Sequence, residues 1–303
     1  MQKTAVARGA TVTDVQSPSL APRGDAAATL APGEVLANRY RVLRYIAGGG
    51  MGEVYETEDT VLAERVAVKL LRPELLRKPG AHARFGDEIR LARKVTHINV
   101  CRVFDVGVDG DKVFFTMQLH SGGTLNSWLA SQGPQPAVEI APLVRQILAG
   151  VGAAHEAGVI HADLKPSNLL LAGDAARLRV VVTDFGLAVP CCAEPGCVCS
   201  APHLLGTPAY ISPEQVSAED PLTQSDVFSL GVILYEMLTG RLPYAGETAV
   251  DMARARLTGP VPSPRAVRPD VDPEWDAVVR RCLARAPRDR FEDAAAVAAA
   301  LGL

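Results

Sequence analysis

Short apolar stretches, separated by glycines and charged turns, run through the chain from Tyr40 to Leu119. They are rich in Val, Ile, Phe and Tyr, the residue types that favour strands. Residues 81–95 differ, because their apolar side chains recur among charges at helical intervals. The pattern therefore predicts a small sheet with one main helix. The expected strands are 40–46, 53–57, 65–71, 101–106 and 113–119.

The pattern becomes helical after residue 123, with clusters of Pro, Gly and Asp between the helices. A sheet-rich lobe followed by a larger helical lobe predicts an α+β fold of two lobes that meet near residues 120–123. Ligand sites occur preferentially in clefts between lobes, so this seam is the first candidate for a binding site. The expected helices are 137–157, 224–238, 274–284 and 293–301.

The first 33 residues have a different composition, rich in Ala, Pro, Ser, Thr and Gly and without the apolar core of a secretory signal. Such a segment cannot bury enough surface to order itself, and we expect a disordered N-terminal arm over residues 1–36. Residues 37–303 then form one domain, with lobes at about 37–119 and 123–303. No stretch approaches the roughly 20 apolar residues of a membrane span, so no membrane span is expected.

The charge and cysteine content of the chain bear on its partners and its surroundings. The 303 residues carry 31 Lys and Arg against 34 Asp and Glu, a formal net charge of −3. A protein whose main partner is nucleic acid usually has a large basic excess, so nucleic acid is not expected as a partner. Six cysteines are too few for a disulfide scaffold and indicate a reducing compartment, which predicts a cytoplasmic location.

Glycines gather between the first two predicted strands, in the run Gly48-Gly49-Gly50-Met51-Gly52. Glycine lets the backbone approach a phosphate without an obstructing side chain, although a flexible hairpin turn explains the run equally well. Lys69 ends the third strand, where its ammonium is either a solvated strand end or a point charge for phosphate oxygens. Glu88, on the helix that follows, is by itself a surface residue, but it has the charge to hold Lys69 in position.

Residues 161–168, with the sequence His-Ala-Asp-Leu-Lys-Pro-Ser-Asn, carry the densest set of reactive side chains. Asp163 offers a carboxylate to a hydroxyl proton, Lys165 a positive charge for a moving phosphoryl group, and Asn168 an oxygen for a metal. Asp184 ends an apolar strand and precedes Phe and Gly, where it offers a second hard oxygen ligand suited to Mg²⁺. Together these side chains provide a base, a cation and two metal ligands.

Taken in order, these motifs resemble the signature set of the protein kinase family. Residues 206–214 resemble the end of a kinase activation segment, and residues 226–231 resemble the helix that supports the catalytic loop. Arg290 matches the residue that pairs with the Glu of the segment end, here Glu214. The resemblance runs from about residue 40 to residue 303. Its main motifs are the glycine-rich run, Ala67-Val68-Lys69, Glu88, His161-x-Asp163 to Asn168, and Asp184-Phe185-Gly186.

The sequence also indicates which kind of protein kinase the chain resembles. Asp163-Leu164-Lys165-Pro166 and Gly206-Thr207-Pro208 resemble Ser/Thr kinases, and the Gly-Gly-Met-Gly loop resembles the bacterial eukaryotic-like type. The resemblance implies a bilobal Ser/Thr protein kinase with ATP in its cleft. Such an enzyme transfers the γ-phosphoryl group of Mg-ATP, or of Mn-ATP in its place, to Ser and Thr hydroxyls of protein substrates, autophosphorylation included.

The resemblance assigns roles to individual residues. The implied catalytic residues are Asp163, Lys165, Lys69 and Glu88. The residues expected to contact ATP are Ala47, Gly48, Gly49, Gly50, Met51, Gly52, Val54, Ala67, Lys69, Met117, Gln118 and Leu119. Asn168 and Asp184 are expected to hold the metal ion.

Two other classes of function stay open. A pseudokinase would bind nucleotide without turnover, but the chain retains the charged residues that turnover needs. A small-molecule kinase of the same fold is disfavoured by the substrate-docking segment 206–214 and by Arg290.

Three alanines depart from the family pattern. Ala162 stands where the family usually has an Arg that binds a phosphate on the activation segment. Since Ala has no charge for this, we expect activity that does not depend strongly on phosphorylation of that segment. Ala92 stands four residues after Glu88, where the family prefers a larger apolar side chain, so packing under the helix is reduced. Ala47 replaces the first glycine of the loop, with a modest expected effect on ATP affinity.

Four of the six cysteines lie close together inside the expected activation segment: Cys191, Cys192, Cys197 and Cys199. Structural zinc sites favour paired Cys-x2-Cys knuckles, which this spacing lacks. Three interpretations stay open: a zinc site, a thiol–disulfide switch, and reduced thiols without a role. Cys101 and Cys282 fall within apolar segments and are expected to be small core residues.

Overall fold

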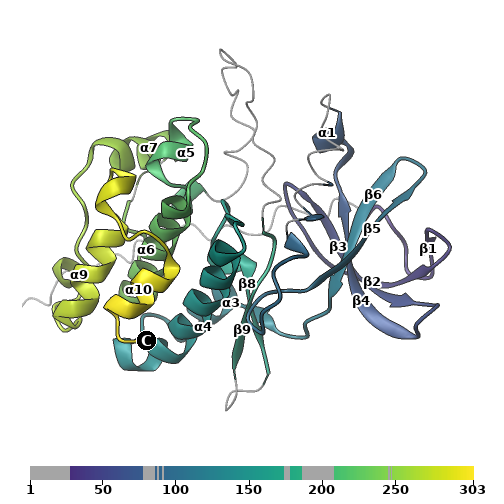
Figure 1. Ribbon diagram of the computed structural model, residues 1–303, viewed down its shortest axis with the longest axis horizontal. Helices are drawn as coiled ribbons and strands as arrows, with labels where there is room; N and C mark the ends of the chain where they lie inside the picture. The colour runs from purple at the N-terminus through teal and green to yellow at the C-terminus, as the bar shows by residue number, and fades with distance from the viewer. Residues whose placement is uncertain are drawn as a thin grey trace, which may run out of the picture.

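The computed structural model describes residues 28–77, 86, 89–90, 92–173, 178–185, 208–244, 246 and 248–303. Within these residues a sheet-rich lobe comes first and a helix-rich lobe second, and Figure 1 shows the two side by side. The expected α+β fold of two lobes is confirmed.

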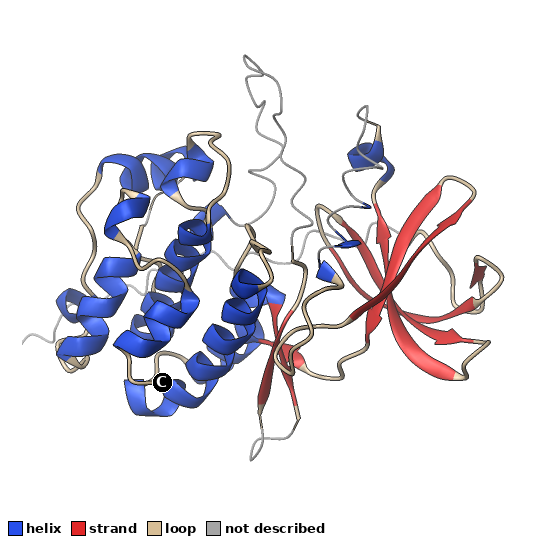
Figure 2. Cartoon of the chain, viewed as in Figure 1, coloured by secondary structure: helices blue, strands red, loops and turns tan. Residues whose placement is uncertain are grey.

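Six antiparallel strands form the sheet of the first lobe, in the order β1-β2-β3-β4-β6-β5 (red in Figure 2). The five expected strands are all present, with ends that differ from the expected positions by at most three residues. The short strand β1 was not expected, because two residues carry no periodic signal. The bounds are β1 Val35–Leu36, β2 Tyr40–Gly48, β3 Gly52–Asp59, β4 Glu64–Leu71, β5 Val103–Asp109 and β6 Lys112–Gln118.

Strand β4 is buried on both faces of the sheet, because successive side chains of a strand point to opposite faces. Val66, Val68 and Leu70 join the hydrophobic cluster on one face. Ala67 and Leu71 join a cluster on the other face, which also includes Val181 of the second lobe. Lys69 alternates with Ala67 and Leu71, so strand geometry alone directs its ammonium toward the second lobe.

Residues 28–36 pack against the sheet, which the sequence did not lead us to expect. Residues 28–36 were expected to belong to a disordered arm, but Leu30 and Leu36 are each 1% exposed and lie in the cluster under the sheet. Strand β1 pairs with β2, and Gly33 N donates to Val42 O at 2.8 Å. These two leucines supply the apolar burial that the composition of the arm as a whole concealed. Residues 1–27 lie outside the described part of the chain.

The second lobe is built around α6 (Thr223–Thr239). Nearly all of its side chains are buried, as expected for a helix with apolar residues on every side. The four expected helices are present with ends within two residues of the expected positions. The helices α3 and α7 were not expected, because their apolar spacing is weak. The remaining bounds are α1 Pro73–Leu76, α3 Leu125–Gln132, α4 Ala137–Glu156, α5 Pro213–Val216, α7 Ala249–Thr258, α8 Pro264–Val267, α9 Pro273–Cys282 and α10 Ala294–Ala300.

The helix expected over residues 81–95 falls largely outside the described residues. Where the chain is described, Gly86, Ile89, Arg90 and Ala92 have helical backbone.

Helix α4 alone, among the described helices, is long and apolar enough to cross a membrane by length and composition, which differs from the expectation that no stretch approaches a span. Half of this stretch is buried inside the protein, and its inward residues, including Leu143 and Ile147, belong to the core of the second lobe. We therefore interpret α4 as a core helix.

A small sheet of three strands, β7 (Gly123–Thr124), β8 (Leu169–Ala172) and β9 (Arg179–Val182), lies between the large sheet and the helices (Figure 1). Strands β8 and β9 pair antiparallel, with Leu169 opposite Val182. The residue before β8 and the residues after β9 therefore lie next to each other. This hairpin brings the end of the 161–168 segment to Asp184.

Candidate active site

Lys69 of the first lobe and Asp184 of the second form an ion pair, with Nζ and Oδ1 2.7 Å apart. The Lys69 side chain is 5% exposed and that of Asp184 is 20% exposed. Strand β4 directs the lysine toward the second lobe, and the end of β9 directs the carboxylate toward the first. Apart from this ion pair, Asp184 Oδ1 has no hydrogen-bond partner among the described residues. The ion pair therefore joins the two lobes at a carboxylate that is still partly exposed to solvent.

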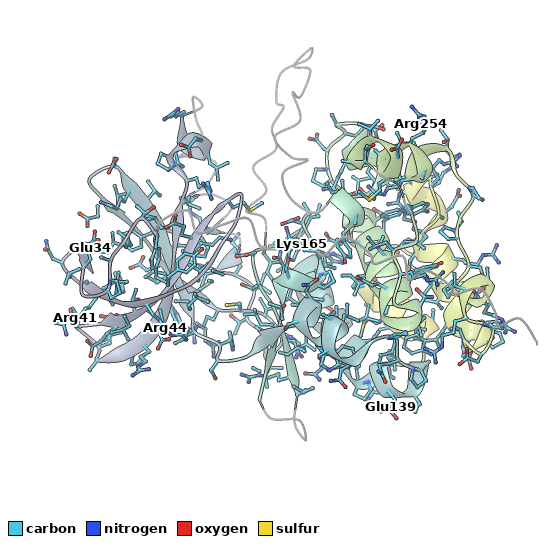
Figure 3. All side chains as sticks on the ribbon, turned by 180° about the vertical axis from the view of Figure 1, so that it is seen from behind. Glu34, Arg41, Arg44, Glu139, Lys165 and Arg254 are labelled. Carbon is cyan, nitrogen blue, oxygen red and sulfur yellow. The ribbon has the colours of Figure 1, made fainter. Side chains whose placement is uncertain are left out.

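Three side chains of the 161–168 segment converge around one carboxylate. Lys165 Nζ lies 2.6 Å from Asp163 Oδ2. Asn168 Nδ2 donates to the same oxygen at 3.2 Å and to the Asp163 carbonyl at 2.9 Å. The segment closes with a short 3-10 turn over Pro166–Asn168, begun by proline, whose fixed backbone angle suits the first position of a helical turn. Figure 3 labels Lys165 in the middle of the molecule, where the two lobes meet.

The backbone of this segment is held from below by Asp226. The carboxylate, fully buried in the first turn of α6, accepts hydrogen bonds from His161 N and Ala162 N, each at 2.8 Å. His155 Nε2 donates to the same carboxylate at 2.9 Å. The expected support of the catalytic loop by residues 226–231 is thus present. Gln215 adds a contact that sequence reasoning missed, since its Nε2 donates to the Ala162 carbonyl at 2.7 Å.

Ala162 adopts a left-handed backbone conformation with a φ of 60°, and Asp184 does the same with a φ of 64°. Residues other than glycine rarely occupy this region, because Cβ comes too close to the backbone. The hydrogen bonds to Asp226 and Gln215 hold the first of these residues in place. Nothing in the sequence indicated a left-handed backbone at either position, because neither residue is a glycine.

His161 links the two halves of the site. Its Nε2 donates to the carbonyl of Thr183 at 2.9 Å, and its Nδ1 accepts from Asp163 N at 3.3 Å. Its ring also lies 4.8 Å, centroid to centroid, from the buried ring of Phe185. One neutral imidazole with its proton on Nε2 satisfies both hydrogen bonds. His161 therefore sets the distance between Asp163 and the residues around Asp184.

The glycine-rich residues form the turn between β2 and β3. The turn is closed by Gly49 N, which donates to Gly52 O at 2.9 Å, and Arg72 Nε donates to the Gly49 carbonyl at 2.8 Å. A side chain on Gly52 would collide with the Leu70 carbonyl, so packing requires this glycine. A side chain on Gly49 or Gly50 would meet nothing within 4 Å, and neither residue has a positive φ. Those two glycines leave open space that phosphate oxygens fit.

The residues expected around adenine lie on three adjacent strands. Ala67 pairs with Met117 and Val66 pairs with Gln118, while Val54 lies opposite Lys69 on β3. The structure therefore brings Val54, Ala67 and the segment 117–119 to the face of the sheet that bears Lys69, or to its edge. Ala47 and residues 48–52 form the neighbouring hairpin.

A small cavity of about 10 Å³ lies behind Met117 and is lined mainly by apolar residues, including Ala92 and Phe185. Ala92 is itself buried. The expectation that a small residue at this position leaves reduced packing agrees with this cavity. Cys101 also lines it, and burial raises the pKa of that thiol to about 12.

Glu214 and Arg290 form the expected pair, with two hydrogen bonds of 2.8 Å between guanidinium and carboxylate. Both side chains are buried, at 3% and 0% exposure. Burial by itself would raise the pKa of Glu214, but hydrogen bonds from Arg290 and Ser225 outweigh it, and the pKa lies below its ordinary value. The pair fastens the end of segment 206–214 to the helical lobe.

Several predicted residues lie outside the described part of the chain. They include Glu88, so the described partner of Lys69 is Asp184 alone, and Gly186, Gly206 and Thr207. Cys191, Cys192, Cys197 and Cys199 lie outside it as well, and the three interpretations of this cluster stay open. Among the described residues no group of three or more His, Cys, Asp or Glu side chains is arranged to hold a metal ion.

The donor set fits a magnesium ion held by a nucleotide and two protein oxygens. Because Asn168 donates through Nδ2 to Asp163, its amide oxygen faces away from that residue. This amide oxygen and the Asp184 carboxylate are hard ligands, and Mg²⁺ is usually held by one or two such groups together with phosphate oxygens and water. The open space at Gly49 and Gly50 and the ammonium of Lys69 complete a site for a polyphosphate.

Comparison with known proteins agrees with this geometry. The sequence model of the protein kinase domain matches residues 40–300. The chain is 38% identical over 267 residues to serine/threonine-protein kinase PknL of Mycobacterium tuberculosis, covering 88% of this chain and 66% of that protein. It is 32% identical over 262 residues to serine/threonine-protein kinase PrkC of Bacillus subtilis, covering 86% of this chain and 40% of that protein. The chain thus spans about two thirds of one relative and less than half of the other.

Among solved structures, the kinase domain of Mycobacterium tuberculosis PknI is similar in fold, with a TM-score of 0.71 and 25% sequence identity. The similarity covers 90% of this chain and 98% of that domain. The agreement therefore includes both lobes and the small sheet between them.

Proposed function

The chain belongs to the protein kinase domain family, with bacterial Ser/Thr kinases among its relatives, and on that premise we propose that it transfers the γ-phosphoryl group of Mg-ATP to Ser and Thr hydroxyls of proteins. The observation that carries the proposal is the 2.7 Å ion pair between Lys69 and Asp184, which brings the two lobes together beside Asp163. Phosphoryl transfer needs mainly positioning and neutralisation of charge, and this arrangement supplies both.

Asp163 is the proposed acceptor of the substrate hydroxyl proton. The Lys165 ammonium and the Asn168 amide both contact its Oδ2, which fixes the direction of the carboxylate. A base held in this way stays in place while the substrate arrives, and orientation of this kind accounts for much of the rate in such reactions. The positive charge of Lys165 would also steady the γ-phosphoryl group as it moves.

Asn168 and Asp184 are the proposed ligands of the metal ion, through the amide oxygen and the carboxylate. When bound, Mg²⁺ neutralises charge on the phosphate oxygens. Lys69 holds Asp184 at 2.7 Å, and we assign its ammonium to the α- and β-phosphates, as the family resemblance implies. We assign Glu88 to hold Lys69, as the family resemblance implies.

The glycine-rich hairpin and the strand edge are the proposed nucleotide cradle. Backbone amides of residues 49–52 would cover the phosphates, and the open space beside Gly49 and Gly50 supports this assignment. Val54, Ala67 and residues 117–119 would surround the adenine, with the backbone of residue 118 supplying polar contacts.

We also propose that the domain works in a reducing, cytoplasmic compartment. The support is the low number of cysteines and the state of the two described ones, since Cys101 and Cys282 are buried and unpaired. Recovery of full activity from protein kept in reductant, and loss of activity under oxidising conditions, would agree with this proposal.

The test of the function is an assay of radiolabelled phosphate transfer to casein and to the chain itself. We expect Asp163→Ala to lower turnover by about 10²–10⁴-fold, the usual contribution of a general base, while ATP still binds. Asp184→Ala should abolish metal-dependent turnover, and Asp270→Ala is the matched control because Asp270 is exposed and its ion pair among the described residues is with Arg268. Full activity in Asp163→Ala would show that the catalytic assignment is wrong. ATP binding without any transfer by the wild type would favour a pseudokinase.

A further inference from the structure

Residues 28–31, called here the N-terminal strap, lie against strand β3. Thr29 donates twice to the carboxylate of Glu53, from its backbone N at 2.9 Å and from its hydroxyl at 3.1 Å. Leu30 N donates to the Tyr55 hydroxyl at 3.1 Å, and that hydroxyl in turn donates to Glu53. The strap and β3 therefore share one carboxylate as their common acceptor.

The strap is also held by the two residues that follow Thr29. The Leu30 side chain is 1% exposed and belongs to the hydrophobic cluster under the sheet. Ala31 N donates to the Glu34 carboxylate at 3.1 Å, and Figure 3 labels Glu34 at the outer edge of the sheet lobe. Thr29 itself is exposed. Its hydroxyl is thus a reachable polar group beside a neighbour, Leu30, whose side chain is fixed in the core.

Glu53 connects the strap to the glycine-rich hairpin. It follows Gly52 directly and pairs across the hairpin with Gly48. Below it, the Tyr55 ring packs edge to face on Tyr45 at 5.7 Å, and the Tyr45 hydroxyl lies where a side chain on Gly48 would be. Whatever holds Glu53 therefore holds the base of the turn that is proposed to cover the ATP phosphates.

The charges around Thr29 mean that a free hydroxyl and a phosphorylated one would affect the strap in opposite ways. As a hydroxyl, it donates to a carboxylate, and the pKa of Glu53 lies below its ordinary value because hydrogen bonds from Tyr55 and Thr29 outweigh the effect of burial. A phosphate ester would have no proton to donate at neutral pH and would bring a charge of about −1.5 to −2 next to that carboxylate. The nearby cation, Arg72, is already engaged with the Gly49 carbonyl at 2.8 Å.

We propose that Thr29 is a phosphorylation site, and that a phosphate on its hydroxyl detaches the N-terminal strap from Glu53 and loosens the glycine-rich hairpin. The inference rests on the proposed function, because the phosphate donor is ATP and the enzyme is a second copy of this chain. In the transfer, the Oγ–H bond of Thr29 breaks and an Oγ–P bond forms. The bond between the γ-phosphorus and the β,γ-bridging oxygen breaks, which leaves phosphothreonine, ADP and one proton.

The expected consequence is weaker nucleotide binding. With the strap attached, the hairpin base is fixed before ATP arrives. With the strap detached, part of the binding free energy is spent on ordering the turn, so affinity falls. Couplings of this kind commonly change affinity by about fivefold or more. The catalytic step changes less, because Asp163 and its neighbours lie in the other lobe.

The first experiment locates the phosphate. The full chain is incubated with Mg-ATP and casein and then examined by peptide mass spectrometry, with Asp163→Ala as the inactive control. We expect phosphate at Thr29 in the wild type and none in the control. Phosphorylated casein with unmodified Thr29 would overturn this inference and leave the proposed function intact. Absence of phosphate from both casein and the chain would contradict the proposed function, and with it the phosphate donor named here.

The second experiment needs no turnover. It compares wild type, Thr29→Glu and Thr29→Ser by titration with a fluorescent ATP analogue and by hydrogen exchange of the amides of residues 45–55. We expect Thr29→Glu to weaken binding about fivefold or more and to speed exchange at residues 48–53. Thr29→Ser keeps the hydroxyl and should resemble the wild type.

Thr60→Glu is the matched control for the second experiment. Thr60 is also exposed, and its hydroxyl donates to the Arg39 carbonyl at 2.8 Å, at the end of β3 away from the hairpin. Unchanged binding and exchange in Thr60→Glu, with both altered in Thr29→Glu, would support the strap. Equal behaviour of the two variants would overturn it.

Discussion

Lys69 Nζ and Asp184 Oδ1 lie 2.7 Å apart, although the first residue belongs to the sheet lobe and the second to the helical lobe. The pair is the polar contact that defines the site across the seam. Both side chains are largely buried, and removal of either charge leaves the other without its partner.

Lys69→Met removes the ammonium and keeps a side chain of similar length. We expect phosphoryl transfer to fall by at least about 10²-fold, the usual effect of losing one preorganised electrostatic contact in an active site. Radiolabelled transfer to casein measures the effect, and circular dichroism checks that the fold is retained. Lys112→Met is the matched control, because Lys112 is the first residue of β6, at the end of the strand away from the seam. Equal losses in the two variants would mean that the Lys69 effect is structural.

Arg290→Met breaks the buried pair with Glu214. An isolated buried carboxylate is costly, so we expect unfolding free energy to fall by about 3–5 kcal/mol near neutral pH. Urea unfolding of the variant and the wild type measures the difference. Arg41→Met breaks an exposed pair with Glu58 and should change stability by less than about 1 kcal/mol.

The effect of Arg290→Met should depend on pH. In the folded protein the pKa of Glu214 lies below its ordinary value of 4.5, so the pair contributes its stability in full above that value. The contribution is lost as the pH falls through the lowered pKa. In the variant the Arg290 hydrogen bonds are lost while the Ser225 hydrogen bond still opposes the effect of burial, so the pKa of Glu214 rises and its charged form is penalised at neutral pH. We expect the difference from wild type to be largest near neutrality and to shrink below about pH 4.5. A difference independent of pH would contradict this assignment.

Ala162→Gly should stabilise the protein. The φ of 60° at this position is unfavourable for any residue with a Cβ, and glycine removes that cost at some loss of unfolded-state entropy. We expect a net gain of about 0.5–1 kcal/mol, measured by thermal unfolding. Ala153→Gly, in the interior of α4, should instead cost about 1 kcal/mol. A loss of stability in Ala162→Gly would mean that the Ala162 Cβ makes favourable contacts that outweigh its strain.

Phosphatase treatment should leave most of the activity. The neutral Ala162 cannot pair with a phosphate on the activation segment. Removal of such a phosphate therefore breaks no ion pair with this residue. We expect a loss smaller than about tenfold, which corresponds to about 1.4 kcal/mol in the barrier. Transfer to casein before and after treatment measures it. A larger loss would show that another cation reads the phosphate.

Cys101 and Cys282 should resist alkylation in the folded protein. Burial raises the pKa of each thiol to about 12, so near pH 8 only about one thiol in ten thousand is the reactive thiolate. Labelling with iodoacetamide, read by mass spectrometry, should spare both residues in the native protein and modify both in denaturant. Glutathione provides the reference rate for a free thiol. Native labelling at that rate would contradict the burial.

The strands and helices could be predicted because their side-chain periods repeat. Strand β4 is a short run rich in apolar residues that begins after charged residues, and α4 repeats its buried residues every three to four positions, so their ends were expected to within a few residues. The short elements β1 and α5 hold too few residues for a period to emerge. The packing of residues 28–36 against the sheet was missed because only two buried leucines, Leu30 and Leu36, account for it.

The identity of the reactive side chains is a property of the sequence, since motif order alone separates Lys69, Asp163, Asn168 and Asp184 from other charged residues. Their partners are a property of the tertiary structure. Asp226 accepts a hydrogen bond from the backbone of the catalytic loop because α6 lies next to that loop. Gln215 donates to the Ala162 carbonyl from a segment that is distant in the sequence. Such contacts join residues far apart in the chain, so no local pattern encodes them.

The sequence by itself determined that this protein has a sheet lobe, a helical lobe and the side chains of a kinase, because periodicity and motif chemistry are local. The tertiary structure alone decided that Lys69 meets Asp184, that Ala162 is held in a left-handed conformation and that Thr29 rests on Glu53. Each of these depends on packing between segments that are distant in sequence, and packing is settled only when the two lobes and the strap bury their apolar faces together.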